Sequence, residues 1–159
     1  MFRIGFGYDV HRFEFGRPFK LGGIEIPFDK GLLGHSDADA LLHSITDAIF
    51  GAVALGDIGS HFPDTDPKYK NVDSKILLSE AYKIVAQSGY KLGNVDATVV
   101  LQKPKIRQYI DEKRESIASI LETDIDKISV KATTSEGMGF VGTEEGIKVF
   151  ATVLLMITE

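Results

Sequence analysis

The chain has 159 residues, a length that predicts a single catalytic domain over residues 1–159. Its longest apolar run is too short to cross a bilayer, so no membrane partner is expected. A net charge of −5, from 18 basic and 23 acidic residues, argues against a nucleic-acid-binding protein, because such proteins need a basic excess. The absence of cysteine excludes disulfides and thiolate metal sites, so any zinc would be held by histidine and carboxylate.

Residues 2–10 alternate between apolar side chains and other residues, which predicts a strand with one apolar face. Side chains at i and i+2 of a strand point to the same side, so Asp9 and His11 project together, away from that apolar face. Such a pair can offer two ligands to one metal ion, or it can be a carboxylate beside a histidine on the surface. The apolar face is expected to consist of Phe2, Ile4, Phe6, Tyr8 and Val10.

The segment "FKLGGIEIP" predicts a hairpin that turns at Gly22–Gly23. An apolar stripe of helical period then predicts a helix over residues 36–55 with Ser36 as its N-cap. Four ionisable residues spaced by four share one side of this segment. A solvated helix face explains that pattern, but two histidines and a carboxylate facing the first strand could also hold zinc with an open fourth position. The four residues are His35, Asp39, His43 and Asp47.

The rest of the chain follows a loop rich in glycine, aspartate and proline over residues 56–67. The element order predicts an α/β (α+β) fold, a two-layer sandwich of one mixed β-sheet with helices on one face. The predicted elements are a helix over 73–88 that ends at Gly89, a strand over 94–102, a helix that Pro104 opens and that ends near 121, and strands over 128–134 and 147–157.

The last predicted strand, "IKVFATVLLMI", is apolar on both faces. Three helices can cover only one face of a sheet of four or five strands, so the other face would expose a large apolar patch, which monomers avoid. We therefore expect a homo-oligomer that buries this face. The alternative is a central strand that the chain itself covers on both faces.

Two loops have the composition of phosphate-binding segments. The segment "QKPKIR" places three basic side chains at a predicted helix start, where free amides and the helix dipole attract anions. The segment "KATTSEGMG" follows a strand with three hydroxyl side chains, Glu136 and glycines. Hydroxyls and amides can hold phosphate oxygens, and Glu136 can hold a hard cation such as Mg²⁺ beside them. A simple turn explains either segment alone.

Five segments together give a specific resemblance that spans nearly the whole chain. They are "GYDVHRF", "LGGIEIP", "KGLLGHSDADALLHSITDAIFGAVALGDIGSHFPDTDP", "GYKLGNVDATVVLQKPKI" and "VKATTSEGMGF". The chain resembles the 2-C-methyl-D-erythritol 2,4-cyclodiphosphate synthases of non-mevalonate isoprenoid biosynthesis. The resemblance implies a ferredoxin-like subunit, a homotrimer with active sites between subunits, and a phosphorus–oxygen lyase. The implied reaction cyclises 4-diphosphocytidyl-2-C-methyl-D-erythritol 2-phosphate to the 2,4-cyclodiphosphate and releases CMP.

The resemblance also implies the residues of the site. It assigns a zinc ion to Asp9, His11 and His43, and a Mg²⁺ or Mn²⁺ ion that bridges the diphosphate near Glu136. It implies that His35 and Thr134 stabilise the transition state. The implied substrate-binding residues are Ser36, Asp57, Ile58, Gly59, Phe62, Pro63, Asp64, Thr65, Asp66 and Phe140. The implied nucleotide-binding residues, contributed by the neighbouring subunit, are Leu101, Gln102, Lys103, Pro104, Lys105, Ile106, Arg107, Ala132 and Thr133.

Three expectations complete the interpretation. His61 has no role in the family pattern and is expected at the surface. No signal peptide is recognisable at the start of the sequence, so we expect a cytoplasmic protein, with a plastid-type organelle as the alternative. The competing functions are a zinc-dependent phosphohydrolase on the same scaffold and a non-catalytic nucleotide-binding trimer.

Overall fold

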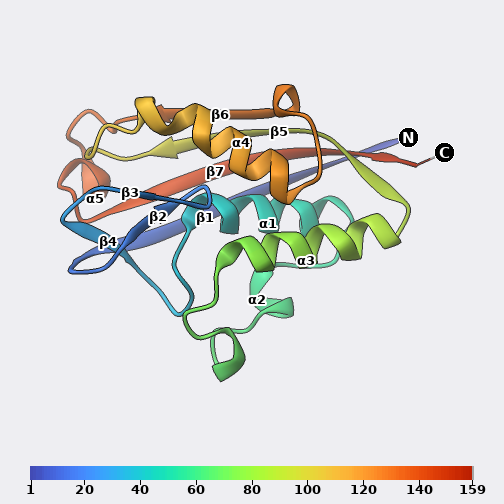
Figure 1. The fold of residues 1–159 in the computed structure, drawn as a ribbon, viewed down its shortest axis with the longest axis horizontal. Coiled ribbons are helices and arrows are strands. Elements are labelled where there is room, and N and C mark those ends of the chain that lie inside the picture. The colour runs from blue at the N-terminus through green and yellow to red at the C-terminus, as the bar shows by residue number, and fades with distance from the viewer. Residues whose placement is uncertain (159) are drawn as a thin grey trace.

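The computed structural model describes residues 1–158, and its framework is a five-stranded sheet with the strand order β4-β1-β7-β5-β6 (Figure 1). Neighbouring strands are antiparallel except β5 and β6, which are parallel, so the sheet is mixed, as predicted. The strands are β1 (Phe2–Phe15), β4 (Lys30–Leu33), β5 (Tyr90–Val100), β6 (Ile128–Thr133) and β7 (Gly146–Ile157).

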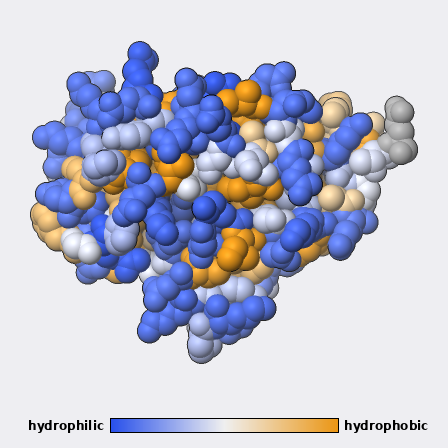
Figure 2. Space-filling model, viewed as in Figure 1, coloured by the Kyte–Doolittle hydropathy of each residue, from blue (hydrophilic) through white to orange (hydrophobic). Residues whose placement is uncertain are grey.

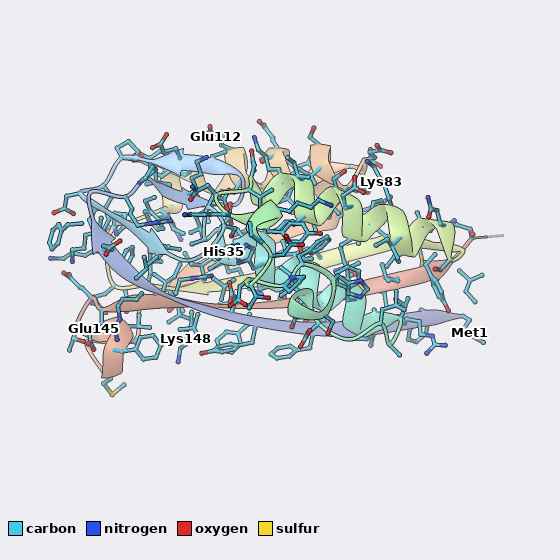
Figure 3. The ribbon with its side chains drawn as sticks, turned by 90° about the horizontal axis from the view of Figure 1, so that it is seen from below. Met1, His35, Lys83, Glu112, Glu145 and Lys148 are labelled. Atoms are coloured by element: carbon cyan, nitrogen blue, oxygen red, sulfur yellow. The ribbon has the colours of Figure 1, made fainter. Side chains whose placement is uncertain are left out.

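Three helices form the second layer: α1 (Ala40–Ala52), α3 (Ser74–Gln87) and α4 (Ile110–Ile120). They lie on one face of the sheet, which gives the predicted two-layer arrangement (Figures 1 and 3). Figure 2 shows this helix-covered side, where hydrophilic residues occupy most of the surface. Alternate side chains of β7 are buried beneath the helices and form the centre of the core: Ile147, Val149, Ala151, Val153 and Leu155.

Two glycines bring α1 unusually close to β1. A Cβ atom at Gly5 would collide with the carbonyl oxygen of Ala48, and one at Gly7 would collide with that of Ser44. Both carbonyls belong to the α1 backbone, so only glycine permits this approach. Beyond Gly7, the next two residues of β1 on the helix side are Asp9 and His11, as the strand alternation predicts. The close packing therefore brings the start of α1 within reach of both side chains.

The predicted hairpin is present as β2 (Phe19–Leu21) and β3 (Ile24–Ile26). Gly22 and Gly23 turn it with φ of +71° and +79°, values that favour glycine. The turn is attached to the start of α1, because the Asp39 carboxylate accepts hydrogen bonds from both glycine amides at 2.9 and 2.7 Å.

The prediction of a helix over 36–55 was wrong at both ends. Ala38 has a φ of +58°, which cannot continue into a right-handed helix, so α1 begins at Ala40. Its N-cap is Asp39, which accepts from the amide of Leu42 at 3.0 Å, and not Ser36. The helix ends at Ala52, since Ala54 again has a φ of +58°.

The helix predicted to open at Pro104 was also wrong at its start. Residues 101–106 are irregular, a 3-10 turn η2 (Arg107–Tyr109) follows, and α4 begins only at Ile110. The fixed φ of proline fits turns as well as helix starts, so Pro104 alone could not show that a helix begins there. The helix over 73–88 is confirmed as α3, capped by Asp73 and followed by Gly89 at a φ of +85°. Shorter elements not predicted are β4, α2 (Ile58–His61), η1 (Pro67–Tyr69), η3 (Ile125–Lys127) and α5 (Gly139–Gly142).

Helices α1, α3 and α4 leave the other face of β1 and β7 open. The strand register places the apolar residues of β1 opposite those of β7 on this face, for example Tyr8 opposite Phe150 and Ile4 opposite Leu154. The face becomes polar over β5 and β6, where Lys131 and Asp96 form an ion pair at 2.6 Å. Figure 3 labels Lys148 on the open side. The predicted apolar patch is therefore exposed on the single chain, with β1 contributing Phe2, Ile4, Phe6, Tyr8 and Val10, all between 43% and 66% exposed.

Within residues 1–158, no helix has both the length and the apolar character needed to cross a membrane.

Candidate metal centre and adjoining cavities

Three side chains from two elements converge at the junction of β1 and α1. Asp9 and His11 come from β1, and His43 comes from the first turn of α1. Their ligand atoms are mutually close: Asp9 Oδ2 lies 2.9 Å from His11 Nε2 and 3.2 Å from His43 Nδ1, and the two nitrogens are 3.4 Å apart. Among the described residues, these three form the group that could hold a metal ion.

The spacing of these atoms fits a tetrahedral zinc ion. Nitrogen and oxygen ligands at about 2.0–2.1 Å from tetrahedral zinc are separated from one another by about 3.3 Å. The ring of His11 is already oriented for this role, because its Nδ1–H donates to the carbonyl oxygen of Leu33 at 2.9 Å. Its Nε2 lone pair therefore faces Asp9 and His43. The residues present fit a zinc ion held by two histidines and one carboxylate, and the three predicted ligands come together within one chain.

The pKa values of Asp9 and His11 both shift in the direction that favours the charged form of each side chain. Burial raises the pKa of Asp9, but hydrogen bonding with His11 and His43 and the positive charge that these rings can carry lower it by a larger amount, so the net pKa falls below its usual value. Burial lowers the pKa of His11, whereas the hydrogen bond and charge of Asp9 raise it to a larger extent, so the net pKa rises.

The other two acidic residues of the predicted ionisable strip do not join the group. Asp39 is fully buried as the N-cap of α1, where burial raises its pKa against the backbone amides that bind it. Asp47 accepts from the amide of Ile58 at 3.0 Å and so fixes the start of the loop that follows α1. Burial also raises the pKa of Asp47. The strip therefore supplies one candidate metal ligand, His43, and two structural carboxylates.

A cavity of about 440 Å³ opens directly on the candidate metal centre. His35 lines it and donates from Nε2 to the carbonyl oxygen of Asp66 at 3.0 Å, so its ring is held against the loop that carries η1. Figure 3 labels His35 near the middle of the molecule. The predicted substrate residues that line this cavity are Ser36, Ile58, Gly59, Phe62, Pro63 and Asp64.

Three other predicted substrate residues shape the loop without lining the cavity. Asp57 caps α2 by accepting from the amide and hydroxyl of Ser60 at 2.8 and 2.6 Å, and Asp66 caps η1 by accepting from Lys68. Thr65 lies between these caps and is exposed. Phe140 lies apart from the cavity, in α5, where it is 40% exposed.

Sequence reasoning missed four residues that line the metal-side cavity. Tyr69 packs edge-on against Phe62, with ring centroids 5.5 Å apart, and lies two residues after the segment "FPDTDP" in the sequence. Nothing in the pattern distinguishes the two leucines from core leucines. The four residues are Leu33, Gly34, Tyr69 and Leu77.

His61 was predicted at the surface, and the structure leaves it partly exposed but packed against α1. Its ring stacks on Phe50 of α1 at 3.9 Å with an interplanar angle of 11°. Its Nε2–H donates to the carbonyl oxygen of Leu55 at 2.8 Å. His61 therefore fastens α2 to the end of α1, in the segment that projects from the body in Figure 1.

A second cavity, of about 310 Å³, lies at the ends of β5 and β6. It collects the predicted nucleotide-binding residues except Lys103, whose Nζ lies 3.4 Å from Glu144 Oε1. Thr134 lines this second cavity and not the cavity at the metal centre. Glu136 is exposed in the loop after β6 and is not part of the metal-binding group. A single chain therefore separates Thr134 and Glu136 from the three candidate metal ligands.

Fold and site define an α+β protein with a candidate metal centre of two histidines and one aspartate beside a cavity. Residues 2–156 match the YgbB family, and the chain belongs to this family. Two curated relatives carry the name 2-C-methyl-D-erythritol 2,4-cyclodiphosphate synthase. That of Shouchella clausii strain KSM-K16 is 59% identical over 159 residues, which is 100% of each chain. That of Bacillus cytotoxicus is 59% identical over 155 residues, or 98% of each chain.

Solved structures of similar proteins have the same fold. The Plasmodium falciparum IspF, described as a CDP complex, superposes with a TM-score of 0.88 at 36% identity, covering 99% of this chain and 97% of the other. The bifunctional IspDF of Campylobacter jejuni superposes with a TM-score of 0.97 at 45% identity over 100% of this chain. This chain spans 43% of that bifunctional chain.

Proposed function

We propose that this chain is a 2-C-methyl-D-erythritol 2,4-cyclodiphosphate synthase, a phosphorus–oxygen lyase of non-mevalonate isoprenoid precursor biosynthesis. Its substrate would be 4-diphosphocytidyl-2-C-methyl-D-erythritol 2-phosphate. The observation that carries the proposal is the convergence of Asp9, His11 and His43 on one point at the wall of a cavity, in a member of the YgbB family. The name shared by the 59% identical relatives supports the same reaction.

The proposed reaction is an intramolecular phosphoryl transfer. An oxygen of the 2-phosphate attacks the β-phosphorus of the diphosphate, a new P–O bond closes the ring, and the bond from that phosphorus to the bridging oxygen breaks. CMP leaves with the bridging oxygen and its electron pair. Because an anionic nucleophile approaches an anionic diphosphate, catalysis depends mainly on positioning and charge stabilisation.

The side chains divide this work between them. Zn²⁺ bound by Asp9, His11 and His43 would supply a Lewis acid toward a phosphate oxygen. His35 is held on the wall of the same cavity by its hydrogen bond to Asp66, where it can orient a phosphate. The methylerythritol part would be bound by Ser36, by residues 57–59 and 62–66 of the loop after α1, and by Phe140. Thr134 is proposed to stabilise the transition state, and Glu136 to hold a Mg²⁺ or Mn²⁺ ion on the diphosphate.

We further propose a ferredoxin-like subunit that assembles as a homotrimer with active sites between subunits. The apolar face of β1 and β7 supports assembly, because its exposed side chains from Phe2 to Val10 need cover from a second copy. The separation of Thr134 and Glu136 from the metal ligands supports a shared site, since a neighbouring chain can bring its nucleotide cavity to the metal-side cavity. The cavity formed by residues 101–107 with Ala132 and Thr133 would bind the cytidine nucleotide. A cytoplasmic location stays a prediction.

Phosphorus NMR of the authentic substrate tests the reaction. The zinc-loaded protein is expected to produce the cyclic diphosphate and CMP, and removal of zinc or the change His43→Ala should stop the conversion. The variant His61→Ala is the matched control and should still convert saturating substrate, because it removes a histidine outside the metal-binding group. Linear phosphate products would identify a phosphohydrolase, and nucleotide binding without turnover would identify a non-catalytic module. Conversion that continues unchanged without zinc would contradict the proposed role of the metal.

A further inference from the structure

A carboxylate and a hydroxyl outside the metal-binding group lie directly behind His43. Ser74 is the first residue of α3 and is fully buried. Its amide donates to Asp37 Oδ2 at 3.0 Å, and its hydroxyl donates to Asp37 Oδ1 in a short hydrogen bond. The same Ser74 Oγ lies 2.7 Å from His43 Nε2. Asp37, Ser74 and His43 therefore form a continuous chain of hydrogen bonds that ends at the candidate metal centre.

The direction of each hydrogen bond in this chain follows from the groups involved. An ionised carboxylate only accepts, so the single hydroxyl proton of Ser74 is committed to Asp37. Toward His43, the Ser74 oxygen can then only accept, which requires the ring proton of His43 on Nε2. In the neutral ring, Nδ1 is then unprotonated and directs its lone pair toward Asp9 Oδ2 and His11 Nε2. Asp37 thus determines, through Ser74, which nitrogen of His43 can bind a metal ion.

We infer that Asp37 and Ser74 are positioning residues that hold His43 in its metal-binding tautomer and orientation. Partners of this kind behind a ligating histidine commonly change metal affinity about 10- to 100-fold when they are removed. We call the hydrogen bonds from Asp37 through Ser74 to His43 the relay. Ser36 can partly replace Ser74 in it, because Ser36 Oγ also lies 3.1 Å from His43 Nε2. The inference rests on the metal centre of the proposed function, but not on the reaction proposed for it.

Asp37→Asn is the most specific perturbation, because the asparagine side chain keeps the shape of aspartate and replaces one hydrogen-bond acceptor by a donor. Its amide group cannot accept from both the hydroxyl and the backbone N–H of Ser74. If the amide nitrogen faces the hydroxyl, the Ser74 proton turns toward His43 and favours the tautomer protonated on Nδ1. If it faces the backbone N–H, two donors oppose each other. We expect Asp37→Asn to weaken zinc binding about 10- to 100-fold, and Ser74→Ala to weaken it less, roughly tenfold, because Ser36 remains.

The neighbouring residue Asp73 provides a matched control. It caps the same helix by accepting from the amide of Lys75 at 2.9 Å, but within residues 1–158 it makes no hydrogen bond to Ser74 Oγ or His43. Asp73→Ala should therefore lower thermal stability while it leaves zinc affinity within about twofold of the unchanged protein. A merely structural role of Asp37 would reproduce this result, with stability lowered and affinity unchanged.

The experiment is a competition titration of zinc between a chromogenic chelator and the full chain or its variants. Long-range ¹H–¹⁵N spectra of the zinc-loaded protein provide a second readout, with His43 expected to carry its proton on Nε2 and to bind zinc through Nδ1. Affinities of Asp37→Asn and Ser74→Ala within twofold of the unchanged protein would overturn the inference, as would a proton on Nδ1 of His43. If Asp37→Asn does not fold, Ser74→Ala decides. An unchanged protein that binds no zinc would contradict the proposed function as well, whereas zinc binding that the variants leave intact contradicts the relay alone.

Discussion

Lys113 destabilises the fold at neutral pH, and this gives a prediction whose size can be worked out. Its side chain is fully buried on α4, and its Nζ atom has no hydrogen-bond partner within the described chain. The closest favourable contact is the ring of Tyr109, whose centroid is 5.4 Å from Nζ. Burial lowers the pKa of Lys113 from 10.5 to about 8, against a smaller opposing effect of the charges on Asp39 and Glu112. At pH 7 the folded protein therefore carries a buried, unpaired ammonium group.

The pKa difference converts into a free energy of unfolding with a defined pH dependence. The folded pKa is about 8 and the unfolded pKa 10.5, so between these values the unfolded chain binds more protons and stability rises with pH. At pH 7 the full penalty is about 3 kcal/mol, since each pKa unit is worth about 1.4 kcal/mol. At pH 9.5 the penalty falls to about 1 kcal/mol, because the folded protein has then lost this proton. The cation–π contact with Tyr109 offsets roughly 0.5–1 kcal/mol.

Lys113→Met tests this reasoning, because methionine keeps the aliphatic stem and removes the charge. Urea denaturation should show the variant about 2–3 kcal/mol more stable at pH 7, with the gain shrinking to about 1 kcal/mol or less at pH 9.5. The change should leave the hydrogen bonds of the buried Asp39 carboxylate intact, since three backbone amides and not Lys113 donate to it. Lys83→Met, at an exposed site on α3, is the control and should change stability by less than about 0.5 kcal/mol. A variant that is less stable at pH 7, or a gain that does not shrink with pH, would refute the argument.

Three further predictions concern packing, the substrate loop and assembly. Gly7→Ala should push α1 away from β1, lower the free energy of unfolding by at least about 3 kcal/mol and weaken zinc binding. Gly51→Ala, whose Cβ would meet only the Phe6 carbonyl oxygen at an ordinary contact distance of 3.9 Å, should stabilise α1 by up to about 1 kcal/mol in the same denaturation assay. Equal effects of the two changes would contradict the close approach. His61→Ala should raise KM several-fold through a loosened loop and leave zinc affinity unchanged, so a change in affinity alone would be inconsistent with its position. Phe6→Asp should dissociate the oligomer in analytical ultracentrifugation, while Ile76→Asp, at an equally exposed apolar site on α3, should not; an intact trimer would argue against assembly through β1 and β7.

The sequence predicted the sheet and most helices because alternation and helical period report which face of each element is buried. It also located Asp9 and His11 on one side of β1, since the i, i+2 rule needs no knowledge of the rest of the fold. The predicted helix bounds were wrong at Ala38 and Ala54, which both adopt a positive φ. Glycine is the usual residue at a positive φ, so an alanine there gives no warning in the sequence. Residues with such local geometry are fixed by tertiary contacts and not by propensity.

The rest of the site depended on contacts between distant segments. Spacing alone could not separate the ligand His43 from the N-cap Asp39, because both occupy one side of the helical segment. Ser74 gave no signal, since a buried serine at a helix start looks like any first-turn residue. The sequence pattern of α4 predicts a solvent-exposed Lys113, although the hairpin turn at Gly22 packs against the aliphatic part of its side chain. The proposed nucleotide-binding residues were assigned by resemblance alone, and all of them except Lys103 line the cavity at the ends of β5 and β6.

The central claim is that one divalent ion binds where β1 meets α1. Anomalous diffraction at the zinc absorption edge, from crystals of the zinc-loaded protein, tests it directly. The account predicts one strong peak per chain, within about 2.0–2.2 Å of Asp9 Oδ2, His11 Nε2 and His43 Nδ1. A peak elsewhere on the chain, or these three atoms turned away from the ion, would contradict it.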